Sequence, residues 1–171
     1  MLRRLCVVSV LALLLVPAVS QAQFKQGDWE LTLSGQAAHG PDLDGVSASA
    51  AGNLGYFLTD QFEIGVRQTL QYTDIGVSGS LNGSTAVAVD YNFDLGRFVP
   101  YIGANIGFVY GDAVNDTWEA GPEGGLKYFV NNTTFVFVSV QYEFFFDQNS
   151  DAGEAFSDGQ FLYGLGIGFR F

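Results

Sequence analysis

Few side chains in this sequence are of the kinds that perform catalysis. His39 is the only histidine, and Asp42, Asp44 and Ser47 follow it closely. Histidine, serine and an acid can together form a nucleophilic site. No local motif of such a site surrounds these residues, so we interpret His39 as a solvated residue of an external loop. Without a second histidine, a histidine-based metal site is not supported either.

Two further stretches contain residue types that bind ions. Asp147, Asp151, Glu154 and Asp158 carry carboxylates, which suit Ca²⁺, but their spacing matches no calcium-binding loop. Residues 121–125 are Gly-Pro-Glu-Gly-Gly, without the lysine or the helix start of a phosphate-binding loop. The sequence therefore predicts no catalytic residue, no metal site and no bound cofactor, and a protein that is not an enzyme.

Nine charged residues stand at positions that alternate with apolar ones along the chain. We interpret them as one polar network, whose role depends on the elements that carry it. The nine residues are Glu30, Glu63, Arg67, Asp90, Glu119, Glu123, Lys127, Glu143 and Arg170.

The elements around these residues are predicted to be long strands. Trp29, Leu31 and Leu33 alternate with Glu30 and Thr32, which is the two-residue period of a strand. Soluble strands average about 5 to 6 residues, whereas a tilted strand needs about 9 to 11 to cross a bilayer. The alternation predicts eight strands of the longer kind, over residues 29–37, 46–57, 62–72, 85–93, 100–110, 118–129, 134–146 and 159–171.

Short and longer connections alternate between these strands. Tight turns are predicted at residues 58–61, 94–97 and 130–133. Acidic, glycine-rich loops are predicted at residues 39–45, 73–84, 111–117 and 147–158. Short periplasmic turns and longer external loops are typical of outer-membrane barrels. The sequence thus predicts an all-β fold, an eight-stranded antiparallel up-and-down transmembrane β-barrel.

The two faces of the predicted strands differ in polarity. Residues such as Val136, Val138 and Val140 would face lipid, and aromatic residues gather at both ends of this apolar face. Aromatic rings prefer the two membrane interfaces, so this placement favours a membrane barrel. A secreted barrel that holds a ligand would instead need its apolar face inside.

The nine charged residues would line the interior of the barrel. An isolated buried charge is costly, so these groups must be paired, protonated or hydrated. Counting from the turns, we expect Arg67 to pair with Asp90 and Glu63, and Arg170 to pair with Glu30. The network is either a structural core or an ion path that its excess of acid would make cation-selective. The interior of an eight-stranded barrel is only wide enough for side chains to fill it, so we favour the structural core.

Four phenylalanines are expected to occupy part of this interior. The last strand opposes them with alternating glycines, which leave room for the rings and favour a plugged barrel over an open channel. The phenylalanines are Phe129, Phe135, Phe137 and Phe145, and the glycines are Gly164, Gly166 and Gly168.

The first 22 residues are predicted to be a signal peptide. Two arginines precede an apolar run over residues 5–16, and small residues at 20 and 22 fit a cleavage site after Ala22. The run is too short for a membrane-spanning helix, which needs about 20 residues. We expect an exported barrel domain of residues 23–171. The only cysteine, Cys6, would leave with the signal peptide.

The last nine residues resemble the carboxy-terminal assembly signal of bacterial outer-membrane barrels. Gly166, Phe169 and Phe171 match that pattern, whereas Gly164 stands where the pattern has a polar residue. Stretches such as residues 55–66 are also similar to the small eight-stranded outer-membrane β-barrels, which include the barrels of the outer-membrane protein A type. The resemblance implies this fold, a location in outer-membrane lipid, and the barrel-insertion machinery as a partner during assembly.

Composition narrows the functional classes further. Eighteen acids against seven bases give a net charge of −11, and loss of two arginines with the signal would make it −13 (5 − 18). Nucleic acid is a poor partner for such a chain. We predict a non-enzymatic barrel with a structural or surface-interaction role through its external loops. The alternative is a small porin-like channel, weakly cation-selective or for small hydrophobic solutes.

Overall fold

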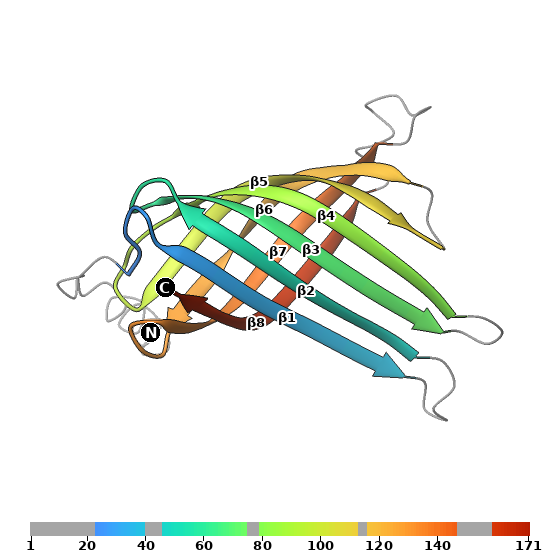
Figure 1. Ribbon diagram of the computed structural model, residues 1–171, viewed down its shortest axis with the longest axis horizontal. Helices are drawn as coiled ribbons and strands as arrows, with labels where there is room; N and C mark the ends of the chain where they lie inside the picture. The colour runs from blue at the N-terminus through green and yellow to red at the C-terminus, as the bar shows by residue number, and fades with distance from the viewer. Residues whose placement is uncertain (1–22, 40–45, 75–78, 113–115, 147–158) are drawn as a thin grey trace, which may run out of the picture.

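The computed structural model describes residues 23–39, 46–74, 79–112, 116–146 and 159–171. Over these residues, eight antiparallel strands pair in sequence order and close into one barrel, with β8 returning to β1 (Figure 1). The strands are β1 (Trp29–His39), β2 (Val46–Phe57), β3 (Phe62–Asp74), β4 (Gly79–Asn92), β5 (Phe98–Gly111), β6 (Thr117–Phe129), β7 (Thr134–Phe146) and β8 (Gln160–Arg170). The predicted fold class is confirmed.

The two ends of the barrel differ in their connections. At one end, which we call the turn end, tight turns join β2 to β3, β4 to β5 and β6 to β7, and both ends of the described chain lie beside them (Figure 1). Side chains stabilise these turns locally: Thr59 Oγ1 accepts a hydrogen bond from Phe62 N at 2.9 Å, and Asn131 Oδ1 accepts one from Thr134 N at 2.8 Å. Gly96, with φ of 77°, supplies the left-handed residue of the β4–β5 turn. We call the opposite end the loop end.

The predicted loop over residues 73–84 is largely strand. β3 continues to Asp74 and β4 begins at Gly79, with Tyr72 directly opposite Leu81. Small polar residues and glycine occupy most of the first half of β4, so the apolar alternation is weak there, although the pairing continues. The backbone of His39 likewise belongs to β1 rather than to the predicted loop.

Several sequence predictions fall outside the described residues. These are the signal peptide of residues 1–22, Asp42 and Asp44, and the acidic stretch 147–158. In the described part of the chain, no helix is long and apolar enough to cross a membrane.

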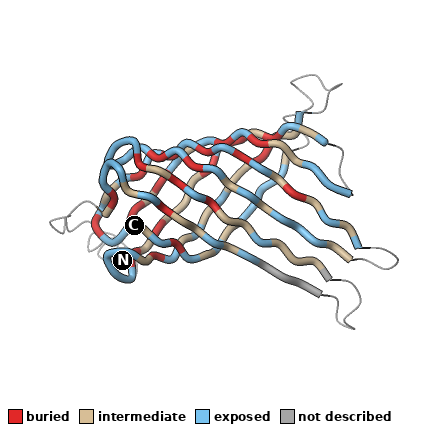
Figure 2. Tube along the Cα trace, in the orientation of Figure 1, coloured by how far each residue is buried: buried red, intermediate tan, exposed pale blue. Residues whose placement is uncertain are grey.

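Buried and exposed residues alternate along the strands (Figure 2). The outward positions form a continuous apolar belt that includes Val66, Val87, Ile102 and Leu165, all exposed. A belt of this extent on every strand is the surface that a barrel presents to lipid, and a water-soluble monomer rarely exposes one. Aromatic pairs flank the belt, as predicted. At the turn end, the outward rings of Trp29 and Tyr56 lie 5.0 Å apart between centroids. At the loop end, the outward rings of Phe108 and Trp118 lie 5.4 Å apart.

Candidate functional site

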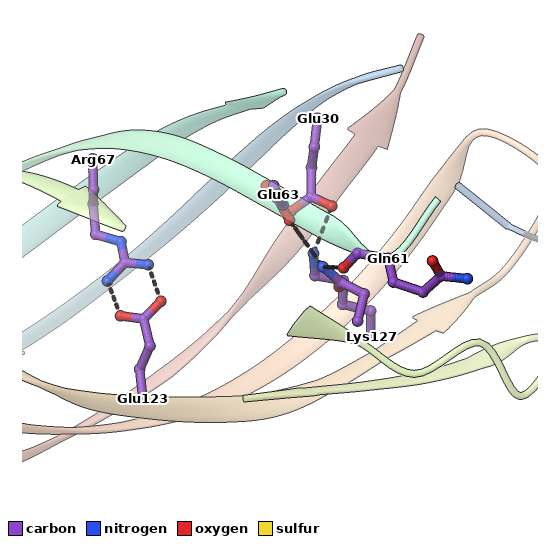
Figure 3. A network of polar contacts seen from close by, with 7 residues as sticks. Glu30, Gln61, Glu63, Arg67, Glu123 and Lys127 are labelled. Carbon is purple, nitrogen blue, oxygen red and sulfur yellow. Dashed lines mark hydrogen bonds and ion pairs between the residues drawn. The ribbon is translucent and has the colours of Figure 1, made fainter. Parts of the chain in front are cut away.

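Lys127 lies at the centre of a buried polar group near the turn end. Its Nζ is 2.7 Å from Glu30 Oε2 and 3.0 Å from Glu63 Oε2 (Figure 3). Asn92 Nδ2 donates a further hydrogen bond to Glu63 Oε2 at 3.3 Å. We call Lys127, Glu30 and Glu63 the lysine triad. These three residues and Asn92 come from β6, β1, β3 and β4, so the group connects strands around the barrel.

A second ion pair lies farther from the turn end. Arg67 Nη1 and Nη2 donate to the two carboxylate oxygens of Glu123 at 2.8 and 2.9 Å, in a fork arrangement (Figure 3). Asn105 Nδ2 donates to Glu123 Oε2 at 2.8 Å. This pair connects β3 to β6 across the lumen, because its members do not belong to neighbouring strands.

The turn end of the lumen is closed by an apolar cluster. It consists of Phe24, Phe57, Val99, Phe129 and Phe135, which are at most 2% exposed. Phe24 stacks on Phe57 with ring centroids 4.2 Å apart and meets the edge of Phe129 at 5.2 Å. We call this cluster the floor. Its rings fill the barrel where β2 and β6 end and where β5 and β7 begin.

The floor and the lysine triad contact one another directly. Lys127 Nζ lies 5.0 Å from the ring centroid of Phe24 and 5.1 Å from that of Tyr101. Cations are attracted to the faces of aromatic rings at such distances. The ammonium group therefore contacts two carboxylates and also lies close to two aromatic rings.

The segment before β1 holds Phe24 in the floor. Gly27 N donates to Phe57 O at 2.9 Å, and Gln26 N donates to Asp60 Oδ1 at 2.8 Å. Arg170 Nη1 lies 3.3 Å from Asp28 Oδ2. We did not anticipate this role of residues 23–28 from the sequence. The available signal was a phenylalanine two residues after the predicted cleavage site.

All nine residues of the predicted polar network lie on the inner face. Seven are buried, and Arg67 and Arg170 are half-buried. The other buried polar residues, Asn53, Asn92 and Asn105, were not singled out, although strand alternation places them on the same face.

The predicted partners within the network are wrong. Arg67 pairs with Glu123 rather than with Asp90 or Glu63, because its long side chain crosses the narrow lumen while the register puts Ala86 opposite it. Arg170 does stand opposite Glu30 in the β1–β8 register. Its guanidinium pairs with Asp28 instead, since Lys127 already binds Glu30.

Inward glycines accommodate several of the buried side chains. A Cβ on Gly103 would collide with Asp90 Oδ1, and one on Gly107 would lie 2.8 Å from Glu119 Oε1. The expected contact between β8 glycines and phenylalanines is confirmed at Gly168, against Phe135. It is also confirmed at Gly166, against Phe137, whereas Gly164 faces Ser139.

A cavity of about 920 Å³ extends from the two ion pairs, whose Glu30, Arg67 and Lys127 line it, toward the loop end. Asp90, Glu119 and Glu143 line it, and within the described chain none of these acids forms an ion pair with a lysine or arginine. Ser84 Oγ donates to Glu119, and Gln160 Nε2 donates to Glu143 at 3.4 Å. The described residues contain no group of three or more His, Cys, Asp or Glu side chains that could hold a metal ion.

Comparison with known proteins gives a likeness in structure alone. No model of a protein family matches the chain, and no curated protein sequence does either. The outer membrane protein OprG from Pseudomonas aeruginosa is similar in structure, with a TM-score of 0.61 at 11% identity. The match covers 89% of this chain and 99% of OprG.

Two further solved structures have the same architecture. The N-terminal β-barrel domain of OprF from Pseudomonas aeruginosa matches with a TM-score of 0.56 at 19% identity, over 86% of this chain and 98% of that domain. Neisserial surface protein A matches with a TM-score of 0.55 at 16% identity, over 84% of this chain and 94% of that protein. The chain has the fold of the small eight-stranded outer-membrane β-barrels. The apolar belt around this fold is the surface that a membrane-spanning barrel presents to lipid.

Proposed function

We propose that the protein is a non-conducting, non-enzymatic outer-membrane barrel with a structural or surface-interaction role through its external loops. The closed floor is the observation that carries this proposal. Phe57, Phe129 and Phe135 are fully buried at the turn end, and Phe24 completes their packing. Ions would have to displace these rings and the lysine triad to cross the barrel.

The energetic cost of such a path supports a structural role. Lys127 is bound to Glu30 and Glu63, and opening the floor would separate charges in an environment of low polarity. The rings of the floor pack against one another with centroids 4.2 to 6.0 Å apart, as in the close-packed interior of a protein. The floor and the two ion pairs therefore serve to hold the strands together.

The alternative is a small cation-selective channel. The cavity and its excess of acid favour it, because carboxylates lining a pore attract cations. This reading requires the floor to move, whereas the proposed role does not.

Recordings from planar bilayers distinguish the two roles. Purified protein inserted at 1 M KCl is expected to leave the baseline current unchanged. Stable current steps that scale with salt concentration would overturn the proposal in favour of the channel.

Two further parts of the proposal concern export and assembly. Residues 1–22 act as a signal peptide that is removed after Ala22, leaving residues 23–171 as the barrel domain. Gly166, Phe169 and Phe171 act as the assembly signal that the barrel-insertion machinery binds. Amino-terminal sequencing of the protein from purified outer membranes tests the first, since a start at Gln23 is expected and a start at Met1 would contradict it.

A further inference from the structure

The seam between β1 and β8 is paired along only half of its length. Register pairs join Glu30–Ser34 to Gly166–Arg170, and toward the loop end the described residues of the two strands form no further pairs. β1 remains paired with β2 as far as His39, and β8 remains paired with β7 back to Gln160. Figure 1 shows β1 and β8 together at the turn end and diverging toward the loop end.

The surroundings of the glycines along this seam also indicate that β1 and β8 separate. A Cβ on Gly166 would collide with the backbone oxygen of Leu33 in β1. A Cβ on Gly164, one inward position farther along β8, would meet Ser139 of β7 and no other described side chain. A Cβ on Gly35 would meet only a β2 backbone atom, Ser49 O, at 3.2 Å. The two strands have therefore parted within two residues of their last pair.

The lumen cavity extends into this gap. Its lining includes inward residues such as Glu143, and also the outward residues Gly35, Phe161, Tyr163 and Leu165 on the two edges of the seam. The last three are among the most exposed apolar side chains of the barrel, at 61%, 75% and 68%. We call the gap the side entrance. Within a bilayer, unpaired backbone is tolerated only where it is buried in protein or lines a water-filled cavity. The cavity reaches the unpaired edges of both strands.

Buried acceptors without a donor line the inner part of the cavity. Asp90 is 6% exposed, and its Oδ1 has no hydrogen-bond partner; the side-chain oxygens of Asn53 and Asn105 are also buried acceptors without a donor. All three residues line the cavity, together with the acids Glu119 and Glu143.

The chain itself offers no further base to this acidic wall. Arg67 and Lys127 also line the cavity but are already paired, and Arg170 pairs with Asp28 at the turn end. The sequence has no lysine or arginine at residues 40–45, 75–78, 113–115 and 147–158, which connect the strands at the loop end. A cation bound at this wall must therefore come from outside the chain.

We propose that the side entrance admits a cationic amphiphile from the outer leaflet, with its amine in the acidic cavity and its hydrocarbon chain between β1 and β8. Phe161, Tyr163 and Leu165 provide the apolar contact for the chain. Asp90, Glu119 and Glu143, which all line the cavity, provide acceptors for the ammonium group. Because the described residues contain no group of three or more such ligands, the acids suit an organic amine better than a metal ion. The proposal does not depend on whether the barrel conducts, because the side entrance lies above the floor.

A pair of cysteine variants tests whether the seam is open. The β1–β8 register pairs Leu33 with Ile167 and would, if continued, pair Gly35 with Leu165. Directly opposed residues lie about 4.5 to 5.5 Å apart between Cα atoms, within the range that a disulfide needs. Under copper-phenanthroline oxidation in phosphatidylcholine nanodiscs, Leu33→Cys/Ile167→Cys is expected to form an intramolecular disulfide and Gly35→Cys/Leu165→Cys is not. Equal formation in the two variants would show a closed seam and overturn the proposal. Disulfide-linked dimers through Leu165→Cys would also overturn it, because a second copy would then occupy the seam.

Photolabelling of the same nanodiscs tests the ligand. A dodecylamine carrying a diazirine on its chain is expected to label residues 160–165 and the loop-end half of β1, located by mass spectrometry of peptides. Dodecyl sulfate with the same diazirine is expected not to label these positions. Equal labelling by the two probes, or adducts spread evenly over the apolar belt, would overturn the proposal.

Matched charge variants complete the test. Glu119→Gln/Glu143→Gln is expected to lower the yield of amine adducts about tenfold, which corresponds to the loss of charge-assisted hydrogen bonds. Asp116→Asn removes an acid that is exposed at the loop end and does not line the cavity, so its yield is expected to match the wild type. An unchanged yield in the double variant would contradict the assignment of the acidic wall as the amine site.

Discussion

At the scale of single residues, the lumen is organised by two basic side chains. Lys127 binds Glu30 and Glu63 near the floor, and Arg67 binds Glu123 farther up. Alternation along the strands was sufficient to predict that these residues face inward. It was not sufficient to predict the partners, since a long side chain in a narrow barrel reaches non-adjacent strands as easily as adjacent ones.

Removing the acid of the upper ion pair should destabilise the barrel strongly. Glu123→Ala leaves Arg67 and the amide of Asn105 without their acceptor, and we expect the free energy of unfolding to fall by about 3 kcal/mol. Urea unfolding in liposomes, followed by tryptophan fluorescence, measures this change. Glu119→Ala is the control, because the hydrogen bond identified for its side chain comes from the hydroxyl of Ser84; its loss should be about 1 kcal/mol. Equal losses would contradict the importance of the ion pair.

Neutral residues at the two acids of the lysine triad should restore the stability that is lost when its lysine is replaced. Lys127→Met should destabilise the barrel by about 3 to 5 kcal/mol, because Glu30 and Glu63 remain buried without their cation. Adding Glu30→Gln and Glu63→Gln should recover most of this loss in the same unfolding measurement, since no uncompensated charge is left. If the triple variant is no more stable than Lys127→Met, then packing at residue 127, and not charge, is what stabilises this region.

At the scale of strands, glycine positions decide how closely side chains fit the wall. Gly103, Gly107 and Gly168 each lie where a Cβ would enter an inward side chain. The two-residue period predicted the β8 stripe and its contact with Phe135. The same logic failed at the loop end of β4, where small polar residues hide the period, and so β3 and β4 are longer than expected.

Gly168→Ala should destabilise the barrel by about 1 to 3 kcal/mol, because the added methyl group displaces the ring of Phe135. Gly52→Ala is a matched control on the outer face, where a Cβ would make an ordinary contact of 3.5 Å with Leu33 Cδ2. The control should be neutral or slightly stabilising, since glycine is unfavourable within a strand. The two variants are compared by urea unfolding, and equal effects would contradict the close fit of Phe135.

A substitution at the end of β8 is expected to affect assembly in cells without affecting the folding of the barrel in liposomes. Phe171 N donates to Trp29 O at 3.0 Å, and Phe171 O accepts from Trp29 N at 2.8 Å, so the backbone of this residue helps to close the barrel. Phe171→Leu keeps both bonds and removes the aromatic ring. We expect it to refold into liposomes as the wild type does, yet to reach the outer membrane of cells in reduced amount. Normal amounts of folded protein in cells would contradict the assembly signal.

At the scale of the whole molecule, the barrel has a lumen that the floor closes at the turn end and a cavity on the other side of the floor. The length of the strands, their alternation and the two kinds of connection were enough to predict the closed barrel and its membrane surface. The floor was only partly predictable. Phe129 and Phe135 follow from alternation, but Phe24 lies before the first strand, where no periodicity places it, and only the folded barrel brings it against Phe57.

The most direct test of the closed floor compares single-channel currents of the wild type and of Phe24→Ala/Phe57→Ala in planar bilayers. The two substitutions remove the stacked pair from the floor while leaving the other three members of the cluster in place. The wild type is expected to pass no current, and the variant is expected to show small steps that favour K⁺ over Cl⁻, because the lumen is acidic. Wild-type steps of the same size and selectivity as those of the variant would contradict the account.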